Sequence, residues 1–206
     1  MRGGLVFVSG KNLTAGLLHT TAMYAGRENL PAPRGARISG VDSPARRGDA
    51  PHMKPEVGEM APDFTATVAD GETEMELTLS ALRGETVVLV FYPKDSTPGC
   101  TIQACSLRDH WAELKGKARV FGVSADGAAS HRKFISKRQL PYPLIADPDK
   151  AVCEAFGVWV QKSMMGKKFM GVERSTYVNG PDGRIKAVLE KVSPLGHTEK
   201  LLEILG

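Results

Sequence analysis

The stretch of sequence that decides the fold is residues 91–109, FYPKDSTPGCTIQACSLRD. A continuous apolar and aromatic run over residues 87–92 leads into this stretch and overlaps its first two residues. The run predicts a strand buried on both faces. Pro93 ends that strand. A helix is then predicted over residues 98–115, with Pro98 in its first turn, from the apolar stripe Cys100, Ala104, Leu107, Trp111 and Leu114. A strand and a tight turn therefore deliver the Cys100 thiol to the start of a helix.

The predicted position of Cys100 favours a reactive thiolate. The first turn of a helix has unpaired backbone N–H groups and the positive end of the helix dipole, and both stabilise a negative charge placed there. The thiolate, not the thiol, is the nucleophile. The alternative is a structural cysteine, because cysteine is among the most buried residue types. The local sequence leaves both a reactive thiolate and a structural cysteine open, and the turn before Cys100 favours the reactive thiolate.

A second cysteine, Cys105, lies five residues further along the same predicted helix. On an ideal helix it is about 140° around the axis from Cys100, with the two Cα atoms about 8–9 Å apart. A disulfide requires a Cα separation below about 7 Å. If the two cysteines pair, the first turns of the helix must unwind. Cys105 also lies off the apolar stripe, so a role in packing and a role in chemistry remain comparable alternatives.

Other cysteine chemistry has little support. The third cysteine, Cys153, follows a helical spacing with Phe156 and is expected to serve packing. A zinc site needs four ligands, and no second cysteine pair or H-x₃-H motif accompanies these residues. The four residues between Cys100 and Cys105 also give the wrong spacing for a C-x-x-C oxidoreductase. We therefore expect no metal.

The rest of the chain alternates strand and helix patterns, which favours an α/β fold. Asn179-Gly180-Pro181-Asp182-Gly183 is a turn signal and predicts an antiparallel hairpin between the strands on either side of it. Further strands are predicted at residues 119–124, 143–146, 175–179 and 184–189, and further helices at residues 127–137, 150–156 and 198–205.

The motif P-x-x-x-T-x-x-C, met by Pro93, Thr97 and Cys100, resembles the signature of the peroxiredoxins. The chain is most similar to their peroxiredoxin Q or bacterioferritin-comigratory-protein branch. The resemblance spans residues 54–206 and includes the stretches FGVS (121–124), LIAD (144–147), FGVW (156–159) and GVERSTY (171–177). It implies a thioredoxin-like fold of the peroxiredoxin type, with a mixed central sheet flanked by helices.

The resemblance also implies roles for individual residues. Cys100 would be the peroxidatic cysteine and Cys105 the resolving one, which form an intramolecular disulfide. Thr97 would offer its hydroxyl to the thiolate and the peroxide, Arg174 would hold its guanidinium over the same pocket, and Pro93 would shield it. Many relatives carry Glu where this chain has Gln103, a difference that we expect to leave the thiol geometry unchanged.

The implied activity is a thiol peroxidase that reduces hydrogen peroxide and organic hydroperoxides and is recycled by thioredoxin. No cofactor is required, and members of this branch are often monomers. Two alternatives belong to other classes: a peroxide sensor that uses the same dithiol switch without turnover, and a holdase whose activity would survive Cys100→Ser.

Residues 1–52 have a different composition from the remainder. They hold seven Lys or Arg and three Asp or Glu, so the net charge of +4 lies entirely within them. They are predicted to be a disordered basic leader before a domain at residues 53–206. Three interpretations of this leader stay open. It is an upstream extension before a true start at Met53, a transit peptide that would direct the chain to a plastid, or a genuine disordered arm. Otherwise we expect a cytoplasmic protein, with no nucleic-acid or membrane partner.

Overall fold

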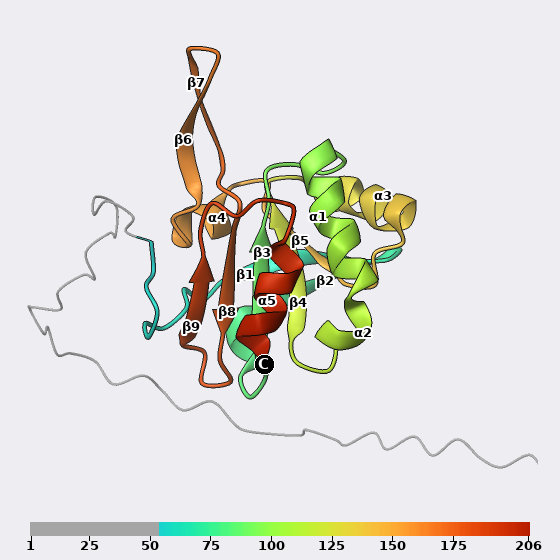
Figure 1. The fold of residues 1–206 in the computed structure, drawn as a ribbon, viewed down its shortest axis with the longest axis vertical. Helices are drawn as coiled ribbons and strands as arrows, with labels where there is room; N and C mark the ends of the chain where they lie inside the picture. Colours follow the sequence, from blue (N-terminus) through green and yellow to red (C-terminus); the bar gives the residue numbers. More distant parts are fainter. Residues whose placement is uncertain (1–53) are drawn as a thin grey trace, which may run out of the picture. The chain divides into compact units, whose positions relative to one another are not determined.

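The computed structural model describes residues 54–206, so the predictions for the leader and for its boundary at residue 53 lie outside the described residues. The main sheet has seven strands in the order β2-β1-β5-β4-β3-β8-β9 (Figure 1). Its strands are β1 (Thr65–Asp70), β2 (Thr73–Thr78), β3 (Val87–Phe91), β4 (Arg119–Ser124), β5 (Leu144–Ala146), β8 (Ser175–Asn179) and β9 (Ile185–Leu189). The helices are the 3₁₀ helix η1 (Leu79–Leu82), α1 (Pro98–Asp109), α2 (Trp111–Leu114), α3 (Ala128–Arg138), α4 (Ala151–Ala155) and α5 (His197–Leu205).

The sheet is mixed. Strand β4 pairs in parallel with β3 and β5, whereas β1 with β2, β1 with β5, β3 with β8, and β8 with β9 are antiparallel. The α/β class with a mixed, helix-flanked sheet is therefore confirmed, as is the predicted hairpin of β8 and β9.

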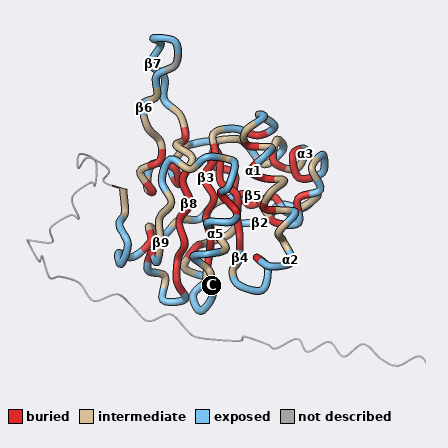
Figure 2. Tube along the Cα trace, in the orientation of Figure 1, coloured by how far each residue is buried: buried red, intermediate tan, exposed pale blue. Residues whose placement is uncertain are grey.

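Strand β3 is buried on both faces, as its sequence predicted (Figure 2). Val88 and Val90 point to one face, where they join the apolar cluster formed with α1, α2, α3 and α5. Val87, Leu89 and Phe91 point to the other face, which is covered by η1 and α4. The period-2 alternation of a strand thus divides the core into two layers.

The predicted helix over residues 98–115 is wrong beyond Asp109. Helix α1 ends there, and a separate short helix, α2, follows after His110, whose backbone has φ −99° and ψ 15°. The His110 backbone N–H donates to the Ser106 carbonyl, and the ring Nδ1 lies 2.9 Å from the same oxygen. The ψ of 15° lies far from the helical value of about −42°, so the helical series of hydrogen bonds is interrupted after His110.

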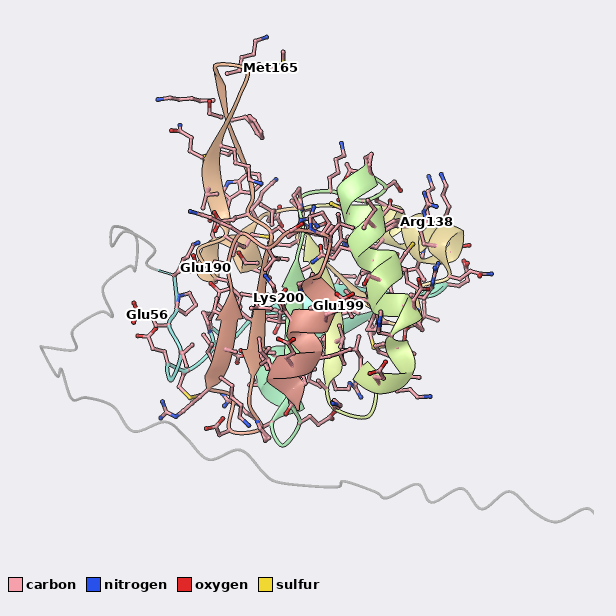
Figure 3. The ribbon with its side chains drawn as sticks, viewed as in Figure 1. Glu56, Arg138, Met165, Glu190, Glu199 and Lys200 are labelled. Carbon is pink, nitrogen blue, oxygen red and sulfur yellow. The ribbon has the colours of Figure 1, made fainter. Side chains whose placement is uncertain are left out.

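The sequence patterns did not predict β1, β2, or the two strands β6 (Trp159–Met164) and β7 (Lys167–Val172). The last two pair only with each other and form a hairpin that projects from the main sheet (Figure 1). Met165 at its tip is 96% exposed and points away from the body (Figure 3). An exposed hairpin lacks the alternation of apolar and polar residues that marks a half-buried strand.

Candidate active site

Cys100 lies in the first turn of α1, as predicted. The helix begins at Pro98, and the preceding Thr97 has extended backbone angles. The Cys100 side chain faces the sheet and the residue is only 3% exposed. The thiol is therefore held near the positive end of the helix and largely shielded from bulk water.

Arg174 approaches the same sulfur from a distant part of the chain. Its Nη2 donates to the Cys100 Sγ at 3.3 Å, and its Nη1 donates to the Oε1 of Gln103. The pairing of β3 with β8 explains the contact, because it sets Phe91 opposite Ser175. The residue just before β8 is thereby brought beside the turn that leaves β3. A guanidinium thus supplies a fixed positive charge to the Cys100 sulfur.

Gln103 is a site residue that the sequence interpretation did not identify. It is 2% exposed, and its Oε1 is bound by Arg174, while its Nε2 has no hydrogen-bond partner within the described residues. The available signal was its spacing, since a residue three positions after Cys100 lies on the same face of the helix. The Gln103 side chain therefore contacts the same guanidinium that donates to the Cys100 sulfur.

Thr97 and Pro93 lie on the turn between β3 and α1 that leads to Cys100. The Thr97 hydroxyl donates to the Lys94 carbonyl oxygen at 3.0 Å, so it does not donate to Cys100. Its oxygen remains available as an acceptor. Pro93 is half-buried and lines an open groove beside the turn.

Cys105 and Cys153 differ sharply in their surroundings. Cys105 is half-buried on the same intact helix as Cys100, and all three cysteines are free thiols. Cys153 is fully buried in the core around α4. Burial, followed by the nearby Asp147 carboxylate, raises the pKa of the Cys153 thiol and makes it unreactive. This agrees with the predicted packing role of Cys153.

One cavity lies beside Cys100 and a second lies beside Pro93. Behind Cys100 lies an apolar space of about 10 Å³, too small for a peroxide. Beyond Pro93, an open groove of about 400 Å³ is lined by residues of the turn, the β4–α3 loop and the β6–β7 hairpin, including Lys94, Trp159, Lys162 and Phe169. The groove reaches the turn at Pro93 and Lys94.

Neither a metal cluster nor a membrane span occurs in the part of the chain that the structure describes. Within residues 54–206, no three His, Cys, Asp or Glu side chains are placed to hold a metal ion. None of the described helices is long and apolar enough to cross a membrane.

His197 is a buried neutral imidazole behind the site. It is 1% exposed, and its Nε2 lies 2.8 Å from the Thr176 hydroxyl. Burial, reinforced by the positive charge of Arg174, lowers the pKa of His197 to about 4. In the unfolded chain the same imidazole titrates near its ordinary value of 6.5.

The buried His197 predicts a loss of stability in mild acid. Between pH 6.5 and 4 the His197 imidazole binds a proton in the unfolded chain but not in the folded chain. The free energy of unfolding therefore falls as the pH falls. The loss is at most about 3 kcal/mol. Urea unfolding at pH 7, 5.5 and 4.5 measures it, with His197→Gln as the comparison. A variant with the same pH slope as the parent would assign the acid sensitivity to other groups.

Comparison with known proteins identifies the family of the chain. The model of the AhpC/TSA family matches residues 57–188. The putative peroxiredoxin bcp of Coxiella burnetii is 44% identical over 151 residues, which cover 73% of this chain and 98% of that protein. Peroxiredoxin Bcp of Bacillus subtilis is 41% identical over 154 residues, covering 74% of this chain and 96% of the relative.

Solved structures of the same branch share the fold. The bacterioferritin comigratory protein of Xanthomonas campestris, studied for its alkyl peroxide reduction activity, superposes with a TM-score of 0.64 at 37% identity, covering 69% of this chain and 89% of that one. BcpB of Mycobacterium tuberculosis gives a TM-score of 0.63 at 33% identity, covering 73% and 97%. The chain therefore belongs to the AhpC/TSA family, within its Bcp or peroxiredoxin Q branch, and is a peroxiredoxin, an oxidoreductase that reduces peroxides.

Proposed function

We propose that the chain reduces hydrogen peroxide and organic hydroperoxides with Cys100 as the peroxidatic thiol and Cys105 as the resolving thiol. A dithiol protein of the thioredoxin type returns both to the reduced state. The observation that carries this proposal is the contact between the Arg174 Nη2 and the Cys100 Sγ at 3.3 Å, in the first turn of α1.

In the first step the Cys100 thiolate attacks one oxygen of the peroxide. The O–O bond breaks, the sulfur becomes a sulfenic acid, and the other oxygen leaves as water or an alcohol after it takes a proton. Arg174 is suited to this step because its N–H groups can donate both to the sulfur and to the oxygen on which negative charge develops.

The residues of the turn support the same step. The Thr97 hydroxyl hydrogen is already used by the Lys94 carbonyl, so the Thr97 oxygen can accept a hydrogen bond from the peroxide. Pro93 has no N–H and presents a rigid apolar ring at the edge of the groove. Together they orient the peroxide and limit the access of water.

In the second step Cys105 condenses with the sulfenic acid. The Cys105 sulfur attacks the Cys100 sulfur, an S–S bond forms, and water leaves. Both residues lie on one intact helix, α1, where a five-residue separation holds the Cα atoms too far apart for a disulfide. The first turns of α1 must therefore unwind in each cycle.

The groove beside Pro93 supports activity on organic hydroperoxides. Trp159, Phe169 and Met170 line it, and the last two are 45% and 47% exposed. An alkyl chain bound there would bury apolar surface on both partners while the hydroperoxide reaches Cys100. The Xanthomonas campestris relative was studied for its alkyl peroxide reduction activity, which supports the same substrate class for this chain.

Turnover requires an external dithiol, because the cycle leaves the enzyme as a disulfide. A thioredoxin-type protein fits, since it supplies two electrons and two protons by thiol–disulfide exchange. We also expect the enzyme to act as a monomer in a reducing compartment such as the cytoplasm, where free thiols persist.

The test of this cycle is Cys105→Ser in an assay with thioredoxin, thioredoxin reductase, NADPH and hydrogen peroxide. We expect the variant to reduce one equivalent of peroxide at the parental rate and then to stop, because no sulfur can resolve the sulfenic acid. Trapping of that acid with dimedone gives an independent readout. Sustained turnover with thioredoxin by Cys105→Ser would remove Cys105 from the resolving role.

A further inference from the structure

A buried polar network lies beneath the turn that carries Pro93 and Thr97. At its centre the Asp95 carboxylate, in a residue only 7% exposed, accepts three side-chain hydrogen bonds. Tyr92 Oη donates to Oδ1 at 2.7 Å, Ser130 Oγ donates to Oδ2 at 2.7 Å, and His131 Nδ1 lies 2.9 Å from Oδ2. No step of the peroxidase cycle described above uses these groups.

Both ring nitrogens of His131 face oxygen atoms, and the Tyr92 hydroxyl also lies 3.5 Å from Nδ1. Its Nε2 lies 3.1 Å from the carbonyl oxygen of Ile145, which can only accept, so Nε2 carries a proton. Its Nδ1 faces the Asp95 carboxylate, also an acceptor, so Nδ1 carries a proton too. His131 is 0% exposed, and with an oxygen acceptor at each ring nitrogen its surroundings suit a fully buried imidazolium paired with a carboxylate.

The charges around this pair fit the assignment. Although burial acts in the opposite direction, hydrogen bonds from His131, Ser130 and Tyr92 and the charge of His131 lower the pKa of Asp95. Burial and the Asp95 charge raise the pKa of Tyr92 well above its usual value, so Tyr92 remains a neutral donor. Asp126, on the β4–α3 loop, accepts from the backbone N–H of Asp95 at 2.8 Å and from Ser124.

The network ties one point of the turn to three separate elements. Through Asp95, the turn is bound to Tyr92 at the end of β3, to Asp126 in the β4–α3 loop, and to α3. The next residue, Ser96, has φ 58°, a left-handed conformation that is costly for a residue other than glycine. A locally strained residue therefore separates the anchored part of the turn from the start of α1.

We propose that Asp95 and His131 are positioning residues for the peroxidase reaction, whose buried ion pair anchors the turn so that Pro93 and Thr97 stay in place beside the peroxide. The same anchor keeps the turn before Ser96 in place, so that only the chain after Ser96 unwinds when Cys105 forms the disulfide with Cys100. This inference rests on the proposed function for its kinetic consequences, but not for the protonation of His131.

The kinetic test compares Asp95→Asn, His131→Gln and the double variant with the parent. Stopped-flow tryptophan fluorescence separates the oxidation of Cys100 from the later disulfide step. We expect each single variant to slow the oxidation about 10- to 100-fold through displacement of the turn. The disulfide step should not slow, because the unwinding segment lies beyond the anchor. The double variant should resemble the slower single variant, since paired residues act as a unit.

The matched control is Ser130→Ala, which removes one hydrogen bond to Asp95 and leaves the ion pair in place. We expect it to slow Cys100 oxidation less than about fivefold. Parental oxidation rates in folded Asp95→Asn and His131→Gln would overturn the positioning role. So would equal slowing of both steps, which indicates general destabilisation.

The protonation of His131 is tested on the unaltered protein, which avoids any difficulty with folding of the variants. ¹⁵N-correlated NMR of the imidazole should show protons on both Nδ1 and Nε2 at pH 7. A ring with a single proton would overturn the ion pair. If instead the parent's Cys100 does not react with peroxide at all, the proposed function and the kinetic role fail together, and the imidazole spectrum still decides the ion pair.

Discussion

Replacement of Cys100 by serine should lower the rate constant for peroxide reduction by on the order of 10⁴ or more, as expected when a catalytic nucleophile is removed. A hydroxyl is a far weaker nucleophile than a thiolate, even with the Arg174 guanidinium beside it. Serine has nearly the volume of cysteine, so α1 and the core around it should remain folded. The effect should therefore lie in the chemistry and not in stability.

The measurement is peroxide consumption in the presence of thioredoxin and its reductase, together with mass spectrometry of the oxidised chain. Cys153→Ala is the matched control, because Cys153 is also buried. The Cys153 thiol differs from Cys100 in that its pKa is raised and no guanidinium donates to its sulfur in the described residues. We expect this control to keep the parental rate. Retention of activity by Cys100→Ser, or its loss in folded Cys153→Ala, would contradict the assignment of Cys100 as the nucleophile.

Replacement of Arg174 by lysine should lower kcat/KM for peroxide by about 10²- to 10³-fold, the range for loss of one preorganised donor at a developing charge. The substitution keeps the positive charge, so it tests geometry. The planar guanidinium contacts both the Cys100 sulfur and the Gln103 side chain. A lysine ammonium is a point charge on a flexible stem and cannot hold the two contacts in one plane.

The control for Arg174→Lys is Arg184→Lys. Arg184 is an exposed arginine whose Nη1 donates to the Gly58 carbonyl at 2.9 Å, and it takes no part in the site. We expect no change in kcat/KM for the control. If Arg174→Lys kept the parental kcat/KM, charge alone would account for the contribution of this residue, and the fork geometry would be irrelevant.

The elements with strong local signals were predicted well. The buried strand β3, the strand β4 and the β8–β9 hairpin occur where continuous apolar runs or a turn sequence indicated them. Burial on both faces leaves an unambiguous apolar pattern, and Gly and Pro mark the turns. The edge strand β2 and the β6–β7 hairpin are largely exposed, so their sequences carry little apolar periodicity and were missed.

The candidate site also has residues that the local sequence predicted and residues that it did not. The position of Cys100 in the first turn of a helix was evident from local sequence, because a strand, a proline-containing turn and an apolar stripe meet there. Arg174 was expected near the thiol only from the resemblance to a family. Its contact depends on the pairing of β3 with β8, a long-range pairing that no local pattern specifies.

By itself, the sequence determined the strand–turn–helix unit, the placement of a thiol at the helix start, and a separation of the two cysteines that requires unwinding before a disulfide forms. These are short-range properties, set by propensity, proline and the geometry of one helix. Only the tertiary structure decided that Arg174 contacts both the Cys100 sulfur and the Gln103 side chain, and that a buried Asp95–His131 pair lies beneath the turn. Such contacts join residues 36 to 74 positions apart, and they exist because sheet pairing and close packing bring those residues together.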